Sequence, residues 1–186
     1  DEDFSCMVCQ DVDLSGAIFN EVNFDYSDFT RSDLREATFH KCSLNGAIFA
    51  EALLDNANFV NCPMEKTNFK GINVNFTKFI ECDLVMSDFS AASLGNLCMF
   101  SSTSLSHARF TGTTLDTVVF NDCAMTPLDI SQAVIDKTTF FKCHLEELTM
   151  KGAAITLSLF HSVKLIGSDF SNKNLSQVQF HESSLD

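Results

Sequence analysis

The sequence predicts an all-β fold, a four-sided parallel β-helix of about nine coils, and three observations support this prediction. Apolar residues recur at every fifth position, small residues stand two places before many of them, and similar residues recur every 20 positions. A period of five fits neither a 3.6-residue helix nor an alternating strand. The chain must therefore turn about every fifth residue, with one large and one small side chain pointing inward each time.

The first part of the five-residue register runs from Phe4 to Leu94. Every central position in it is apolar, and most are Phe or Leu. Small residues such as Ala37, Ala47 and Ala57 stand two places earlier. The remaining positions are mostly polar, which predicts that they face solvent.

The register then slips by one residue near positions 95–97 and resumes from Phe100 to Leu185. We expect a bulge at a corner here, near Gly95, because glycine tolerates the backbone that a bulge needs. Of the 19 Phe, only Phe76 and Phe141 fall outside the register. We expect residues 1–186 to form a single domain that continues through the slip.

A second period gives the number of sides. If four units of five residues make one coil, similar residues of successive coils stack on one another every 20 residues. Stacking of this kind gives a solenoid its continuous core. About nine coils at the ~4.8 Å spacing of paired strands would make a rod roughly 43 Å long. Alternate sides carry mostly Phe, so their rings should face one another inside the rod. The 20-residue period is seen in Phe19, Phe39, Phe59, Phe79, Phe100, Phe120, Phe140, Phe160 and Phe180.

The sizes of the two inward residues of a unit vary in opposite directions. Where the small position holds a large residue, the central position holds a smaller one, as in Ile72 with Val74 and Leu128 with Ile130. A close-packed interior of fixed cross-section requires this compensation.

The units Ala57-Asn58-Phe59 and Ser87-Asp88-Phe89 show the repeat clearly, and 37 such units follow one another. In this respect the chain resembles the pentapeptide-repeat family over essentially its whole length. The resemblance implies that the four-sided β-helix is right-handed.

The composition excludes several function classes. The formal net charge is −13, and so acidic a surface repels nucleic acid phosphates and anionic lipids, which argues against direct nucleic acid binding. No apolar run is long enough for membrane insertion. The chain begins at Asp1 without Met, so we expect either a processed protein or a piece of a longer one.

The eight cysteines are expected to be structural. Cys42, Cys62 and Cys82 recur at the small inward position, where Cys acts as a compact hydrophobic residue. Free buried thiols imply a reducing compartment, which favours the cytoplasm. Cys6 and Cys9 form a C-x-x-C, but a zinc site needs two further ligands that the sequence does not place nearby. We therefore expect neither a metal site nor a cofactor.

The sequence shows no catalytic motif. His161 and His181 should lie on adjacent coils, where two imidazoles could bind a metal weakly or change charge near pH 6, but solvated surface residues are the simpler interpretation. A rod with a filled core offers no cleft in which to tune a carboxylate. We predict that the protein is not an enzyme.

One side should carry outward apolar residues. β-branched residues favour extended backbone for local reasons, but this does not account for an outward Phe. An apolar strip on a polar rod is a candidate contact surface. The strip comprises Ile18, Val60, Ile80, Val119, Phe141 and Leu159.

These features favour a non-enzymatic interaction or scaffold module with a protein partner. The repeat begins by Phe4 and still runs at Leu185, so we expect either capping by sequence outside these residues or an end-to-end or side-to-side oligomer. The family resemblance implies one concrete setting, the substrate-recognition β-helix domain of a bacterial effector such as a secreted ubiquitin ligase. It also implies an alternative, an acidic DNA mimic that binds DNA gyrase and protects it from quinolones.

Overall fold

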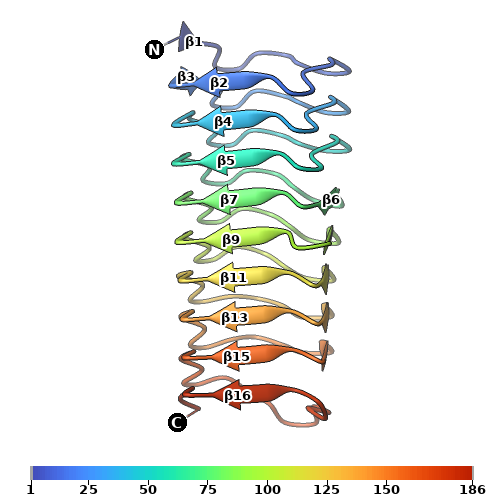
Figure 1. The fold of residues 1–186 in the computed structure, drawn as a ribbon, viewed down its shortest axis with the longest axis vertical. Coiled ribbons are helices and arrows are strands. Elements are labelled where there is room, and N and C mark those ends of the chain that lie inside the picture. The colour runs from blue at the N-terminus through green and yellow to red at the C-terminus, as the bar shows by residue number, and fades with distance from the viewer. Residues whose placement is uncertain (1, 186) are drawn as a thin grey trace.

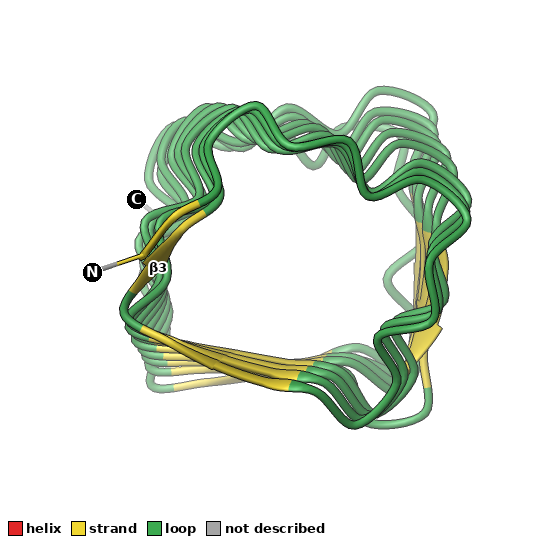
Figure 2. Cartoon of the chain, turned by 90° about the horizontal axis from the view of Figure 1, so that it is seen from above, coloured by secondary structure: helices red, strands yellow, loops and turns green. Residues whose placement is uncertain are grey.

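A computed structural model describes residues 2–185 as a chain that winds through stacked, parallel coils with four walls (Figures 1 and 2). All regular elements are short β-strands. Nine of them form one parallel sheet, which we call the nine-stranded wall. Its strands are β2 (Ile18–Asn20), β4 (Thr38–His40), β5 (Asn58–Val60), β7 (Lys78–Ile80), β9 (Met99–Ser101), β11 (Val119–Asn121), β13 (Thr139–Phe141), β15 (Leu159–His161) and β16 (Gln179–His181).

A second parallel sheet, the five-stranded wall, precedes the nine-stranded wall in each coil. β1 (Glu2–Asp3) and β3 (Val22–Asn23) pair on a third wall, and isolated parallel bridges continue the remaining ladders. The predicted four-sided parallel β-helix is thereby confirmed. The five-stranded wall contains β6 (Asn73–Asn75), β8 (Ser93–Gly95), β10 (Thr114–Asp116), β12 (Val134–Asp136) and β14 (Ala154–Thr156).

The corners explain the period of five. In almost every unit, the second residue after the central one has a left-handed backbone, for example Glu21 with φ 58°, Arg31 with φ 58° and Lys41 with φ 53°. This conformation costs a non-glycine residue roughly 1–2 kcal/mol. Most corners also donate a hydrogen bond to the next coil, as from the Lys41 N–H to the Val60 carbonyl at 2.9 Å. Six corners hold glycine, which adopts this backbone readily, and at the others the stacked ladder stabilises a conformation that most residue types do not favour.

The extra residue lies at a corner, but Gly95 is not the residue that absorbs it. Gly95 belongs to β8 and pairs with Asn75 at an offset of 20 residues, whereas Met99 pairs with Lys78 at an offset of 21. Asn96 and Leu97 are both left-handed, with φ 45° and 63°. The corner therefore holds two left-handed residues in place of one, and the glycine backbone expected at this point is not used.

Stacked phenylalanines fill the interior, as predicted. The Phe59 ring lies parallel to those of Phe39 and Phe79, with centroids 4.9 and 5.1 Å away. It also meets Phe49 of the opposite wall at 5.8 Å and 81°. Offset stacking and edge-to-face contacts are the favoured geometries of aromatic pairs.

The small inward position has a second role besides its size. Thr77 Oγ1 donates to the Leu54 carbonyl at 2.7 Å, and the Cys82 thiol donates to the Phe59 carbonyl at 3.4 Å. Within the described residues, no buried side-chain nitrogen or oxygen lacks a hydrogen-bond partner. Ser, Thr and Cys at this position therefore help to join successive coils.

The predicted compensation of sizes is confirmed, but it is imperfect in one region. Leu128 and Ile130 are both buried, as are Ile72 and Val74. An apolar cavity of about 10 Å³ lies beside Leu128 and Ile130, where the Phe column that reaches Phe110 is interrupted. The smaller central residue leaves space that a phenyl ring fills elsewhere.

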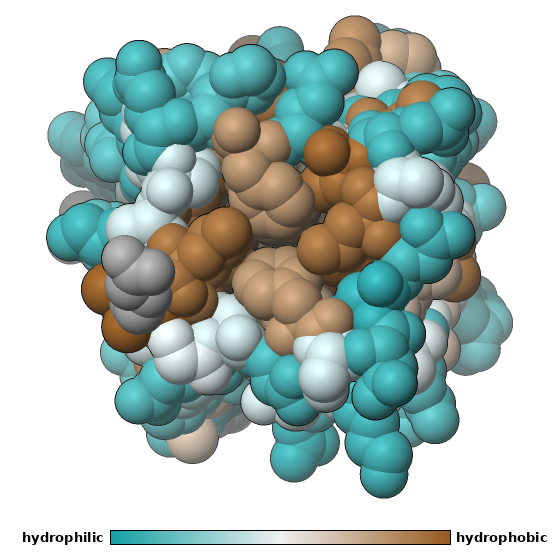
Figure 3. Space-filling view, turned by 90° about the horizontal axis from the view of Figure 1, so that it is seen from below, coloured by the Kyte–Doolittle hydropathy of each residue, from teal (hydrophilic) through white to brown (hydrophobic). Residues whose placement is uncertain are grey.

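The C-terminal end of the rod shows apolar side chains surrounded by polar ones (Figure 3). Phe170, Leu175 and Phe180 of the last coil are partly buried against the core, and Ile166 and Leu185 are exposed. The described residues contain no helix that could cross a membrane.

Candidate interaction surface

The six residues of the predicted strip all lie on the outer face of the nine-stranded wall. Strand residues alternate between the two faces of a sheet, so the residues on either side of each buried central Phe point outward. They form two columns, one before the Phe and one after it. Ile18 is 79% exposed, and the other five residues are half-buried. Val60 and Ile80 are in-register neighbours in β5 and β7.

The apolar residues do not form an unbroken line. Val119 lies beside Met99, but Thr139 separates it from Leu159 in the same column. Ser101 and Asn121 separate Ile80 from Phe141 in the other column. The structure therefore places the six residues on one wall, but polar residues interrupt both columns, and Met99 is a further apolar member. Met99 was absent from the predicted strip, although its place just before Phe100 could have indicated it.

The nine-stranded wall is free of carboxylates. The chain contains 25 Asp and Glu residues, yet none occurs in the nine strands. Lys78 and three histidines are the ionisable residues on these strands. A wall of this kind is unusual on a chain with a net charge of −13.

The three C-terminal strands carry a row of outward rings. Phe141 and His161 have ring centroids 5.1 Å apart, and His161 and His181 are 6.2 Å apart. The Lys142 ammonium lies 5.2 Å from the centre of the Phe141 ring. The predicted adjacency of His161 and His181 is confirmed. No group of three His, Cys, Asp or Glu residues suited to a metal occurs in residues 2–185.

Three exposed apolar residues extend this surface around one corner. Phe76 follows β6 and is 46% exposed, Leu97 follows β8 and is 56% exposed, and Leu157 follows β14 and is 50% exposed. Each stands two residues before a strand of the nine-stranded wall. Phe76 was recognised as outside the register, but nothing in the sequence indicated that it and Leu97 would share a corner.

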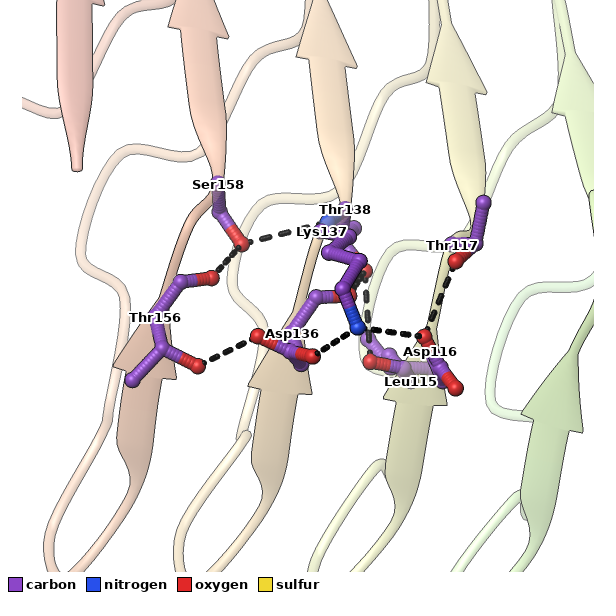
Figure 4. A network of polar contacts seen from close by, with 8 residues as sticks. All are labelled: Leu115, Asp116, Thr117, Asp136, Lys137, Thr138, Thr156 and Ser158. Atoms are coloured by element: carbon purple, nitrogen blue, oxygen red, sulfur yellow. Dashed lines mark hydrogen bonds and ion pairs between the residues drawn. The ribbon is translucent and has the colours of Figure 1, made fainter. Parts of the chain in front are cut away.

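The five-stranded wall, by contrast, is polar (Figure 4). Lys137 Nζ lies 2.7 Å from an Asp136 carboxylate oxygen and 3.9 Å from one of Asp116. Thr156 Oγ1 donates to Asp136 at 2.6 Å. The hydrogen bond from Lys137 lowers the pKa of Asp136. Apart from Val134, which is 48% exposed, this wall presents mainly charged and hydrogen-bonding groups.

The cysteines are structural in position. All are free thiols, and all except Cys6 are buried. Cys62 and Cys82 occupy successive coils, and desolvation raises the pKa of the Cys98 thiol to about 12. A thiol with so high a pKa is a poor nucleophile at neutral pH. Cys6 is exposed whereas Cys9 belongs to the core, so the C-x-x-C does not present two accessible thiols.

Comparison with solved structures finds the same fold. Full-length QnrB1, described as a plasmid-mediated fluoroquinolone resistance protein, aligns with a TM-score of 0.81 and 19% identity over 93% of this chain and 91% of that chain. A trypsin-treated variant of QnrB1 gives a TM-score of 0.82 and 19% identity over 93% of this chain and 88% of that chain. HetL, a pentapeptide repeat protein from the cyanobacterium Nostoc sp. strain PCC 7120, covers 100% of this chain and 85% of its own length at 14% identity with a TM-score of 0.48. No curated protein matches the chain.

Family models match nearly the whole length. A model described as "Pentapeptide repeat region" matches residues 75–150 and 113–186. Models described as "Pentapeptide repeats" match residues 32–71 with eight copies and residues 4–48 with nine copies. These matches agree with the four-sided coil and its five-residue units. The chain belongs to the pentapeptide-repeat family.

Proposed function

We propose that this protein is a non-enzymatic interaction module that binds a protein partner through the nine-stranded wall. The observation that carries the proposal is the charge distribution, since a chain with 25 acidic residues keeps all of them off these nine strands. Its outward apolar residues, including Phe141 and Ile80, lie on the same wall. A surface with little charge and scattered apolar residues can lose its hydration water at low free-energy cost when a partner binds.

The filled interior supports a role without catalysis. Successive Phe rings stack at about 5 Å, and the cavity beside Ile130 measures about 10 Å³, too small for a substrate. Active sites generally need a concave site with perturbed ionisable groups. Here Asp33 and Asp136, whose pKa is lowered, are held by neighbouring basic side chains on the outer walls. The pKa of Asp169 is lowered by hydrogen bonds from Ser171.

A more specific form of the proposal concerns the larger protein to which this β-helix would belong. As the β-helix of a secreted ubiquitin ligase or a similar bacterial effector, this wall would recognise the protein to be modified. The free thiols suit the reducing cytoplasm of a bacterium or host cell. Identification of a ligase domain in the same polypeptide would support this setting, and its absence from the complete reading frame would overturn it.

Capture of partners by the intact rod tests the main proposal. Ile80→Ser with Phe141→Ser removes two outward apolar groups, and we expect loss of partners in a quantitative pulldown. Leu53→Ser with Val134→Ser is the matched control, because these residues are outward, 47% and 48% exposed, and outside the nine-stranded wall. Equal recovery by the two double variants would show that the nine-stranded wall is not the contact surface.

The similarity of fold to QnrB1 and the net charge of −13 favour one second candidate. In that function, which is the alternative given in the sequence analysis, the acidic walls would mimic DNA and bind DNA gyrase. A supercoiling assay with gyrase, with and without a quinolone, tests it. Protection from the drug or inhibition of supercoiling would support this function, and neither effect at micromolar protein would exclude it.

A further inference from the structure

The last coil pairs with its neighbour on only two of its four walls. β15 and β16 pair in full, and on the next wall the Leu145 N–H donates to the Lys164 carbonyl at 2.9 Å. Among the described residues, no backbone hydrogen bond joins residues 149–157 to residues 169–176. The equivalent bonds exist one coil earlier, where Ile130 and Gln132 each donate at 2.8 Å to Thr149 and Lys151. The segment that leads into β16 accordingly runs apart from the regular stack (Figure 1).

Position at the end of the rod does not account for this opening. The first described coil is also terminal, yet it pairs on the corresponding walls. Cys9 donates to Asp28 at 2.8 Å, and Leu14 donates to Asp33 at 2.8 Å. The opening therefore has a cause in the residues of the last coil.

Lys173 lies in this opening. It stands two places before Leu175, at the small inward position that Ala133 and Ala153 occupy in preceding coils. Its ammonium lies between the two coils and donates to the carbonyls of Met150 at 2.5 Å and Ala153 at 3.1 Å. A lysine is too long and too polar for the interior, and its ammonium takes a carbonyl that the next coil would otherwise use.

The opening leaves a groove and an unpaired strand edge. The groove has a volume of about 770 Å³ and is lined by Lys151, Asp169, Ser171 and Lys173 among others. β14 has β12 on one side and no strand on the other. Such an edge is a template for an added strand, because its N–H and C=O groups need partners.

We propose that Lys173 is a wedge that holds the last coil open, so that the edge of the preceding coil binds an extended segment of a partner polypeptide. Backbone chemistry identifies the occupant. This edge lacks the hydrogen bonds that a parallel strand would make with it, and an extended polypeptide segment can supply them. Mixed charges along the groove, with Lys151 opposite in sign to Asp169, suit a polar segment rather than a purely apolar one. This site lies outside the nine-stranded wall and does not depend on that wall's proposed function.

Hydrogen exchange tests the wedge. In the wild type, the amides of Met150, Gly152 and Ile155 should exchange at least tenfold faster than those of Ile130, Gln132 and Ile135. Lys173→Ala should close the coil and slow these three amides by about tenfold, whereas Lys164→Ala, which removes an outward lysine of the same coil, should not. Lys173→Thr, which copies Thr113 of the same column, replaces the alanine variant if that variant does not fold. Protection in the wild type, or no change in the folded Lys173 variant, would overturn the wedge.

A peptide probe tests the acceptor edge. A fluorescent peptide of residues 128–137 copies the segment that already pairs with the coil's other edge and carries Ala133 in the small position. We expect it to bind the wild type in an anisotropy titration and to bind the Lys173→Ala protein at least tenfold more weakly. The same peptide with Asp136→Pro, which lacks a backbone donor at a position that does not face the Ala153 carbonyl engaged by Lys173, is the control. Failure of the wild type to bind, or equal binding of the two peptides, would overturn the acceptor site.

Discussion

Phe49 and Phe59 meet edge to face across the interior of the rod, with ring centroids 5.8 Å apart and an interplanar angle of 81°. Each ring is also stacked on others of its own wall, as Phe59 is on Phe79 at 5.1 Å. The two columns therefore support each other, and loss of one ring removes contacts in both directions.

Phe59→Ala should lower the free energy of unfolding by roughly 3–5 kcal/mol, because the site lies between two stacked rings and cannot collapse easily. The measurement is urea unfolding followed by circular dichroism. Phe141→Ala, on the outer face of the same wall, is the control and should cost about 1 kcal/mol or less. Similar costs for the two variants would contradict the inward assignment of the five-residue register.

Ile130→Phe and Leu128→Ala should compensate each other. The first alone adds a ring beside a large neighbour, and the second alone enlarges a cavity that already measures about 10 Å³. Together they restore the common pairing of a small residue with Phe. Each single variant should cost about 1–3 kcal/mol, and the double variant should be more stable than the sum by at least ~1 kcal/mol. Additive costs in urea unfolding would show that the two positions do not share one volume.

Deletion of Leu97 should leave the fold intact. Asn96 is already left-handed and would serve as the single corner residue, which restores the 20-residue offset between β7 and β9. We expect the melting temperature to change by a few degrees at most. Deletion of Asn61, a regular corner residue, is the matched control and should abolish or strongly weaken folding. Loss of folded protein on deletion of Leu97 would mean that the extra residue is required for packing.

Stability should fall in alkali because of buried thiols. Desolvation raises the pKa of Cys98 to about 12 from an ordinary value of 9.0. A group with a raised folded pKa stabilises the fold fully below its unfolded pKa, and this contribution is lost as pH rises through the folded pKa. The free energy of unfolding should therefore decline between about pH 9 and 12. Cys98→Ala should reduce that slope in urea unfolding, and an unchanged slope would show that this thiol does not contribute.

The sequence predicted which side chains point inward with few exceptions. A repeat of five places Phe39, Phe59 and Phe79 in one column, because a close-packed interior accepts large side chains only at fixed places along the axis. It also placed all six residues of the strip on one wall, since a period of 20 assigns each unit to its side. Whether that strip binds a partner stays a prediction.

The turns at the corners follow from the period of five, but their left-handed backbone could be predicted from the sequence only in part. Six of the seven glycines, Gly46 and Gly71 among them, lie at the left-handed position and carry a signal for it. Glu21 and Lys41 occupy the same position but are of types that do not favour this backbone, so local propensity gives no signal there. Likewise, the extra residue is absorbed by Asn96 and Leu97, while the nearby glycine remains in a strand.

The sequence by itself determined the repeat, the four walls and the core, because those follow from the spacing of apolar side chains along the chain. Only the tertiary structure decided how the last coil sits on the coil before it. Lys173 occupies a regular position of the repeat, but its effect depends on the carbonyls of Met150 and Ala153 that lie within reach of its ammonium. Hydrogen bonds between coils form across about 20 residues of chain, and spacing alone does not reveal where one long polar side chain replaces them.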